Sequence, residues 1–335
     1  MAKSLQEIKF SVLDLSPITE GGTAANAFEH TIDLARYAEK WGYNRYWVAE
    51  HHSMPGIASS ATSVLIGYIA GGTNSIRVGS GGIMLPNHAP LVIAEQFGTL
   101  ESMYPGRIDL GLGRAPGSDQ ITAHALRRST RRDGNDFPEQ LEELRNYLEP
   151  QDETQLPIRA IPGEGLNIPI WLLGSSGFSA KLAGELGLPF SFASHFSPDY
   201  TLPALDIYRK HFTPSESLET PYVMVGVNVI VAETEEKAKY LATSFSQAFL
   251  SLIRGMPTKL KPPVSNMDEL WSIHEQAIVD QQLKASIVGT PEQVKEKLQK
   301  FLAETDADEM IVNTQVFSHE DRLESYRLLK ELAHK

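Results

Sequence analysis

Cysteine is absent from the 335-residue sequence, so disulfides, thiol nucleophiles and thiolate metal sites are all excluded. The sequence also lacks an uninterrupted apolar run of about 18 residues, the length that a membrane-spanning helix needs. Its first residues, 1–4, lead into a strand pattern without the apolar core of a signal peptide. We therefore expect a soluble, cytoplasmic protein with no membrane partner.

Clusters of positive charge are scarce. The 30 Lys and Arg residues are outnumbered by 42 Asp and Glu residues, and the resulting net charge of -12 opposes binding to a phosphate backbone. The basic clusters are two arginine pairs, at 127–128 and 131–132, which we interpret as part of a solvated loop. Nucleic acid is therefore not an expected partner.

Short β-rich segments alternate with longer helical segments along the whole chain, a rhythm typical of parallel strands joined by helices. Eight strand segments are present, and eight strands are enough to close a barrel. They cover residues 8–14, 45–50, 76–82, 107–114, 168–175, 190–195, 222–232 and 309–317. The pattern predicts an α/β fold, a (β/α)8 TIM barrel, with an open doubly wound sheet as the second choice.

Two segments exceed what a minimal barrel needs. Residues 120–165 are charged and rich in turn-forming residues, and residues 255–282 also lack the regular alternation. We expect both to be insertions at the C-terminal face of the barrel, beside the active-site mouth. The prediction for the whole chain is a single domain over residues 1–335.

The strand ends are the places to search for chemistry, because barrel active sites lie where strands end and the following loops begin. The second strand ends in Glu50, His51 and His52, an acid and two imidazoles that are able to exchange protons. A pair of histidines satisfied by ordinary hydrogen bonds is the simpler interpretation. A metal site ranks lower, because neighbouring residues on a strand point to opposite faces.

Glycines and an arginine follow at the next two strand ends. The third strand ends in Ser80, Gly81 and Gly82, where the backbone is free to approach a flat ligand closely; an ordinary glycine turn fits the spacing equally well. The fourth strand ends in Arg114, whose guanidinium suits a phosphate or a carboxylate.

The fifth strand runs into a turn rich in serine. Ser175, Ser176, Gly177 and Ser179 lie at the expected start of a helix, where free N–H groups and the helix dipole favour an anion. Simple capping of the helix by serine is the alternative. The spacing of these serines does not match the G-x-S-x-G pattern of hydrolases.

Taken together, these motifs resemble the luciferase-like monooxygenase family, and the resemblance covers nearly the whole chain. The motifs that carry it are Glu50-His51-His52, residues 78–82 (Val-Gly-Ser-Gly-Gly), Gly113-Arg114, the serine-rich turn after Trp171, and the phrases at 94–100 and 109–120.

The resemblance implies an enzyme in which reduced FMN and O2 oxidise a small organic substrate. NAD(P)H would supply the electrons indirectly, through a separate flavin reductase, unless the flavin is reduced in place. Matched by motif, His51 would be the catalytic residue at the flavin edge and Glu50 would support it. The flavin would be bound by Ser80, Gly81, Gly82, Arg114, Ser175, Ser176, Gly177 and Ser179.

The resemblance also implies a cis peptide bond between Gly81 and Gly82, and no metal. Light emission is not expected, because the chain has its own form of the insertion segments. A homodimer is expected, with residues 62–71 and 90–103 as candidates for its apolar face. The alternatives are a deazaflavin-dependent hydride-transfer enzyme and a non-catalytic flavin-binding protein, with a barrel hydrolase far behind.

Overall fold

The computed structural model describes residues 3–115, 119–126, 136–150 and 157–334. Eight parallel strands form a closed barrel, which confirms the predicted fold. In order around the barrel they are β1 (Lys9–Asp14), β2 (Arg45–Val48), β3 (Arg77–Ser80), β5 (Ile108–Gly113), β6 (Ile170–Gly174), β7 (Phe190–Phe192), β8 (Val223–Val231) and β10 (Glu309–Asn313). The open sheet is excluded because β10 pairs with both β8 and β1.

Two short strands extend the barrel at its C-terminal end. β4 (Ile83–Met84) pairs with the last two residues of β5, and β9 (Ile287–Gly289) pairs with the last three residues of β8. Both pairings are parallel. They lengthen the wall of the barrel on the face where a barrel enzyme builds its active site.

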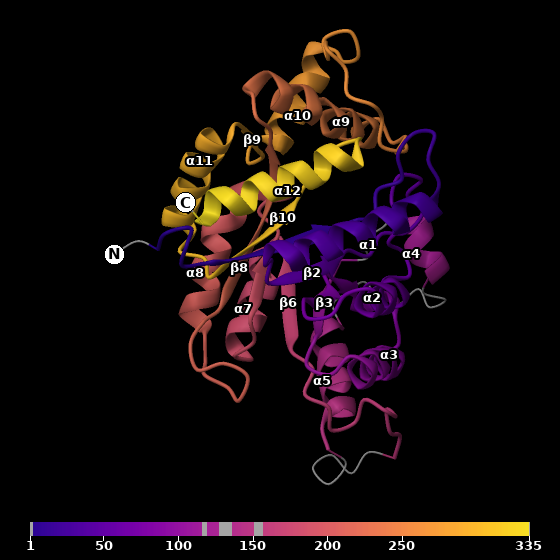
Figure 1. Ribbon diagram of the computed structural model, residues 1–335. Coiled ribbons are helices and arrows are strands. Elements are labelled where there is room, and N and C mark those ends of the chain that lie inside the picture. The colour runs from indigo at the N-terminus through magenta and orange to yellow at the C-terminus, as the bar shows by residue number, and fades with distance from the viewer. Residues whose placement is uncertain (1–2, 116–118, 127–135, 151–156, 335) are drawn as a thin grey trace.

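Helices cover the outside of the barrel, with α12 lying beside α1 so that the two ends of the sequence meet (Figure 1). The helices are α1 (Ala24–Trp41), α2 (Thr62–Gly71), α3 (Pro90–Met103), α4 (Gln120–Leu126), α5 (Phe137–Leu148), α7 (Gly177–Glu185), α8 (Thr201–His211), α9 (Glu235–Ile253), α10 (Ile273–Leu283), α11 (Pro291–Thr305) and α12 (His319–His334). Single 3-10 turns are η1 (Leu85–Asn87) and η2 (Pro198–Tyr200).

The two segments expected as insertions contain helices. Residues 120–165 include α5, whose buried Phe137, Leu141 and Leu144 join the main core beside α3. Part of this segment is therefore an ordinary outer helix between β5 and β6. Residues 255–282 include most of α10. The arginine-rich loop predicted at 127–132 lies outside the described residues.

Local signals explain the ends of α1. Thr23 accepts a hydrogen bond from the backbone N–H of Asn26, and the Asn26 side chain accepts one in return from the backbone of Thr23. This reciprocal capping satisfies donors that a helix start leaves unpaired. Gly42 ends the helix with φ of 77°, a conformation that glycine adopts without steric cost.

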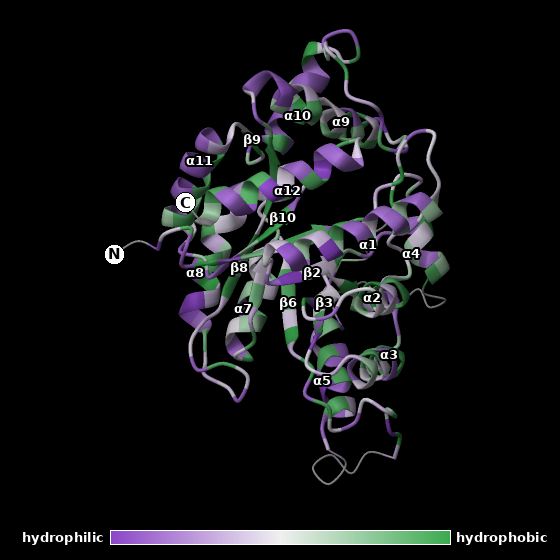
Figure 2. Cartoon of the chain, viewed as in Figure 1, coloured by the Kyte–Doolittle hydropathy of each residue, from purple (hydrophilic) through white to green (hydrophobic). Residues whose placement is uncertain are grey.

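The core consists mainly of branched and aromatic side chains on both faces of the strands. All nine residues of β8 are buried, as expected for a parallel strand covered on both sides. Figure 2 shows the resulting pattern, with green strands inside and mixed purple and green helices outside. Among the described residues, no helix is both long enough and apolar enough to cross a bilayer.

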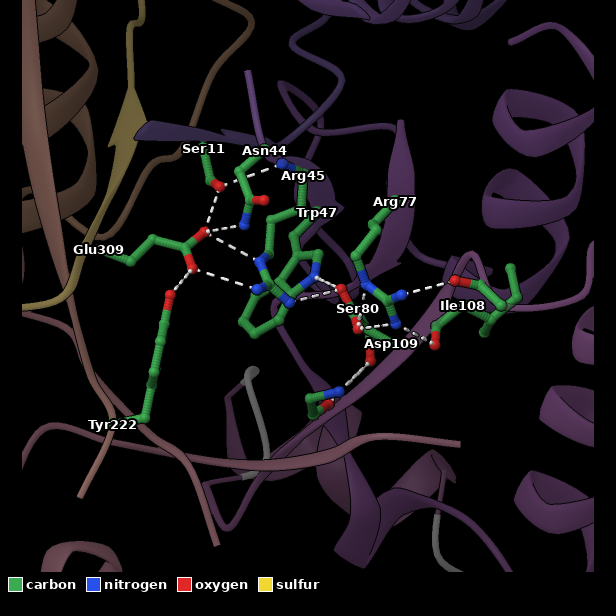
Figure 3. A network of polar contacts seen from close by, with 12 residues as sticks. Ser11, Asn44, Arg45, Trp47, Arg77, Ser80, Ile108, Asp109, Tyr222 and Glu309 are labelled. Carbon is green, nitrogen blue, oxygen red and sulfur yellow. Dashed lines mark hydrogen bonds and ion pairs between the residues drawn. The ribbon is translucent and has the colours of Figure 1, made fainter. Parts of the chain in front are cut away.

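A buried network of charges joins three strands near their N-terminal ends (Figure 3). The Arg45 guanidinium on β2 donates to Asp109 Oδ2 of β5 at 2.7 Å, and to Glu309 of β10 at 2.9 and 3.1 Å. Both carboxylates have no exposed side-chain surface. One cation thus links strands that lie on different sides of the barrel.

Further donors complete the solvation of the two carboxylates. Trp47 Nε1 donates to Asp109 at 3.1 Å, and Arg77 pairs with the other oxygen of Asp109 at 2.6 Å. The Tyr222 hydroxyl donates to Glu309 at 2.9 Å. Burial lowers the pKa of Arg45, but the charges of Glu309 and Asp109 outweigh it and raise this pKa above its ordinary value. Arg45 therefore keeps its charge despite its burial.

Replacing Arg45 with Met should destabilise the fold by about 3–5 kcal/mol, because two buried carboxylates lose their shared cation. Urea denaturation monitored by circular dichroism measures the loss. The matched control is Arg159→Met, because Arg159 pairs with Glu164 at the surface and should leave the midpoint nearly unchanged. Equal shifts of the midpoint in the two variants would contradict a structural role for the network.

Candidate functional site

A cavity of about 270 Å³ opens at the C-terminal ends of the strands. Its floor is made by side chains that point into the barrel from several strands: Leu13, Trp47, Leu173 and Ile311. Its walls come from the loops that follow β1, β2 and β7, together with α9. This is the face that carries the active site in barrel enzymes, so the cavity is the candidate site.

Backbone without side chains forms one side of the cavity at the end of β3. The peptide bond between Gly81 and Gly82 is cis, which confirms the prediction made from the resemblance. A Cβ atom on Gly81 would lie 2.8 Å from Leu13 Cδ1, and one on Gly82 would lie 2.9 Å from the carbonyl oxygen of Gly111. A side chain at position 82 would collide with backbone, and one at position 81 would require Leu13 to move. Gly81 lines the cavity and leaves space for a flat group.

Ser80 contacts the neighbouring strand. Its hydroxyl donates to the carbonyl oxygen of Gly111 at 2.8 Å and accepts from the Gly111 N–H at 3.0 Å. The side chain is fully buried between β3 and β5. In this arrangement Ser80 aligns the two strand ends, and a direct contact with a cofactor stays a prediction.

Glu50 is buried beneath the mouth and accepts several hydrogen bonds. The donors are the Asn87 amide at 3.0 Å and the backbone N–H of Met84 at 2.9 Å, and the Nε2 atoms of His52 and His88 lie 2.8 and 3.0 Å away. Burial raises the pKa of Glu50, but these hydrogen bonds outweigh it and leave the pKa below its ordinary value. The carboxylate therefore holds residues 84–88 against the end of β2.

His51 lies on the other side of the chain from this cluster. Its side chain lines the cavity, whereas Glu50 and His52 do not. The alternation of side chains along an extended backbone explains why adjacent residues separate in this way. His51 therefore lies where it can contact a bound molecule, whereas Glu50 holds the surrounding backbone in position.

A second imidazole, His195, lines the same cavity after β7. The backbone N–H of His195 donates to the carbonyl oxygen of Gly226 at 2.9 Å, and a Cβ atom on residue 226 would lie only 2.3 Å from His195 Nδ1. Gly226 in the middle of β8 therefore makes room for this ring. Burial lowers the pKa of His195 to about 4, and the nearby His51 adds to the decrease. His195 is neutral at physiological pH.

Neither His195 nor two nearby asparagines were among the residues predicted from the sequence. Asn313 Nδ2 donates to Asn228 Oδ1 at 3.0 Å across β10 and β8, and both residues line the cavity. His195 is the last residue of the predicted strand segment 190–195, so its position at a strand end could have marked it as a candidate site residue. The asparagines gave no such signal, because they lie within apolar strand sequences.

Arg114 and the start of α7 come together at the ends of β5 and β6, and neither is among the residues that line the cavity. The Arg114 guanidinium carbon lies 4.2 Å from the centre of the Phe178 ring, in the first turn of α7. Among the described residues, no carboxylate pairs with Arg114. Ser176 is the N-cap of α7 and its side chain makes no capping hydrogen bond. A cation and free helix N–H groups therefore meet at one place, as an anion site requires.

The other predicted residues of this turn differ in exposure. Ser175 is exposed, and Ser176 and Gly177 are half-buried. Ser179 is buried against the backbone of Gly174, where its Cβ atom packs closely. These residues surround the start of α7, where helix N–H groups and hydroxyls are able to bind an anion such as a phosphate. Within the described part of the chain, no group of three or more His, Asp or Glu side chains is placed to hold a metal ion.

Comparison with known proteins agrees with this geometry. Residues 8–309 match the model of a family described as luciferase-like monooxygenase. The chain is 56% identical to a luciferase-like monooxygenase of Escherichia coli strain K12, over 97% of each chain. It is 64% identical to the uncharacterized protein YvbT of Bacillus subtilis, over 96% of each chain.

Solved structures with the same fold bind different flavin-type cofactors. Apo-MsnO8 matches with a TM-score of 0.87 and 36% identity, over 98% of each chain. The oxygenating constituent of 3,6-diketocamphane monooxygenase from Pseudomonas putida, in complex with FMN, matches with a TM-score of 0.71, 20% identity and coverage of 100% and 99%. An F420-dependent secondary alcohol dehydrogenase matches with a TM-score of 0.70, 16% identity and coverage of 98% and 99%.

The last two similarities concern the fold alone. The family model and the relatives of 64% and 56% identity show the family as well as the fold, because these alignments cover nearly all of the barrel and its mouth. The chain belongs to the luciferase-like monooxygenase family.

Proposed function

We propose that the protein is an FMN-dependent monooxygenase that uses reduced flavin and O2 to oxidise a small organic substrate. The observation that carries the proposal is the meeting of Arg114 and the uncapped start of α7 at the C-terminal ends of β5 and β6, on the same face of the barrel as the cavity lined by His51. Reduced flavin, when bound, supplies the electrons that activate O2. The residues of the chain bind it, position it and control the surrounding protons and water.

The phosphate would be held by Arg114 and by the N–H groups at the start of α7, with the hydroxyls of Ser175 and Ser176 nearby. This anchor fixes one end of the cofactor. The glycines at 81 and 82 leave the backbone bare where a flat ring would lie, because no side chain fits there. Anchoring and flat contact together restrict the ring to one orientation.

His51 is the proposed proton donor or acceptor, because it lines the cavity directly after Glu50 in the chain. Glu50 acts as a positioning residue through residues 84–88. The apolar lining would exclude water from the reacting centre, which would limit unproductive release of hydrogen peroxide. His195 offers a neutral imidazole on the opposite side.

A second candidate cofactor is a deazaflavin used for hydride transfer, and the fold-level similarity to an F420-dependent dehydrogenase favours it. The test compares binding of FMN and of deazaflavin, then measures reoxidation of the bound, reduced cofactor by O2. Oxygen-dependent turnover with FMN supports the proposal. Preferential binding of deazaflavin, or binding of FMN without any oxidation of substrate candidates, would favour the hydride-transfer or non-catalytic alternative.

The electrons are proposed to come from NAD(P)H through a separate flavin reductase, in the cytoplasm. We also propose a homodimer, since apolar side chains are exposed on the neighbouring helices α2 and α3. The exposed residues are Val64, Tyr68, Val92 and Met103. Sedimentation at several protein concentrations tests the oligomeric state.

Replacing Arg114 with Ala should weaken FMN binding at least tenfold, because a charge-assisted contact with phosphate contributes about 1.5–3 kcal/mol. Riboflavin, which has no phosphate, should bind equally well to both proteins. Fluorescence titration measures both affinities. The control is Lys181→Ala, which removes a cation from α7 beyond the start of that helix. Unchanged FMN affinity in Arg114→Ala would rule out this phosphate site.

Replacing His51 with Ala should leave FMN affinity within about twofold but make reoxidation of the bound, reduced flavin at least about tenfold faster. The expected cause is loss of the hydrogen-bonding group that controls proton transfer at the flavin edge. Stopped-flow absorbance measures the rate. His274→Ala removes an exposed histidine from α10 and serves as the control. Identical rates for His51→Ala and the parent protein would remove His51 from the mechanism.

The stability of the protein should fall between pH 6.5 and about 4, partly because of His195. Its pKa is lowered in the folded state, so the unfolded chain binds a proton in this range and the folded chain does not. His195→Asn should therefore lose less stability than the parent protein over the same range. Urea denaturation at pH 7 and pH 5 measures the difference. Equal losses would show that His195 is protonated in the folded protein.

A further inference from the structure

The wall of the cavity opposite the proposed phosphate site is formed by three separate segments. In the barrel order β1 lies across from β6, β2 is two strands away from β5, and β8 is two strands away from β6. Arg114 and α7 follow β5 and β6, whereas this wall follows β1, β2 and β8. We call residues 17–20, 54–58 and 245–260 the distal wall. A cofactor anchored at Arg114 leaves the distal wall to contact a second molecule.

Backbone hydrogen bonds join the segments of the distal wall. Ile18 donates to the carbonyl oxygen of Gly56 at 2.9 Å, and Leu260 donates to that of Ile18 at 2.9 Å. A Cβ atom on Gly56 would lie 2.4 Å from the carbonyl oxygen of Thr258, so the second and third segments also pack in direct contact. The wall is therefore a formed surface with a defined shape.

The side chains that the distal wall presents to the cavity are apolar. An aromatic pair on α9, Phe245 and Phe249, packs edge to face with ring centres 5.1 Å apart. The remaining contributors are mainly aliphatic: Pro17, Met54, Ile57, Ala248, Leu252, Pro257 and Leu260. Such a surface binds a molecule by excluding water from apolar area.

Charge is absent from the described residues that line the cavity, which include no Asp, Glu, Lys or Arg. Lys259 lies within the distal wall, but its ammonium group donates to the carbonyl oxygen of Gly22 at 2.8 Å, and it does not line the cavity. A carboxylate that entered this space would lose its hydration without gaining a cation. Burial of an unpaired charge is strongly unfavourable.

We propose that the distal wall selects an uncharged, apolar organic substrate and rejects anionic analogues of the same shape. This inference rests on the proposed function, because it takes the other side of the cavity for the cofactor. Selection depends on desolvation of the substrate, and Leu252 at the end of α9 is a specificity-determining residue at the rim of the wall.

The test uses two probes of nearly equal shape, benzylacetone, which is an uncharged ketone, and hydrocinnamate, which is a carboxylate. Isothermal titration calorimetry measures the affinity of each probe for the FMN-loaded protein. We expect benzylacetone to bind at least about tenfold more tightly than hydrocinnamate, because only the carboxylate loses strong hydration. Comparable affinities, or no binding of benzylacetone, would overturn the inference.

A charged variant tests the wall itself. Leu252→Lys places a cation at the rim and should shift the ratio of affinities toward hydrocinnamate by at least about tenfold. The matched control is Ile253→Lys, because Ile253 is the next residue of α9, is similarly exposed and does not line the cavity. The control should keep the parental ratio within about twofold, and an equal shift in both variants would contradict a role for the distal wall.

Titration with FMN is carried out separately on each variant. If FMN fails to bind the parent protein, the proposed function fails, and the probe affinities of the cofactor-free protein still decide whether the wall selects against charge. If FMN binds and the two probes bind equally well, the inference fails and the proposed function stands.

Discussion

The barrel depends on one buried cation. Arg45 lies at the N-terminal ends of the strands and neutralises Asp109 and Glu309, which come from strands on different sides of the barrel. Two carboxylates without exposed side-chain surface are tolerable only because Arg45, Arg77, Trp47 and Tyr222 solvate them. Because the network ties β2, β5 and β10 together at one end, the other ends of these strands are held at fixed separations.

At the C-terminal face of the barrel, close packing of the backbone matters more than buried charge. Glycine at 81, 82 and 226 removes side chains at three points where a Cβ atom would collide with a neighbour. The space that these glycines leave contributes to the cavity between β3 and β8. It also accommodates the ring of His195. Glycine within strands normally weakens them, so these positions exchange some local stability for the shape of the site.

Charge is also divided between the two sides of the mouth. Arg114 and the start of α7 provide a positive region at the ends of β5 and β6, whereas the distal wall across the mouth carries no charged side chain among its described cavity-lining residues. A molecule with an anionic group at one end and a flat, apolar group at the other fits between these two sides of the mouth in a single orientation. The electrostatics of the site therefore support the same arrangement as its shape.

The sequence alone predicted the eight strands, their parallel direction and the alternation with helices, because these depend on local periodicity and turn chemistry. It also predicted Glu50, His51, Gly81, Gly82, Arg114 and the serine turn as site residues, because they stand at strand ends. Only the tertiary structure decided which of these side chains face the cavity: His51 does, whereas Glu50 and Ser80 bond to neighbouring backbone. The tertiary structure also placed His195, Asn228 and the distal wall beside them. These contacts join residues far apart in the chain, and closure of the barrel, not local sequence, sets their distances.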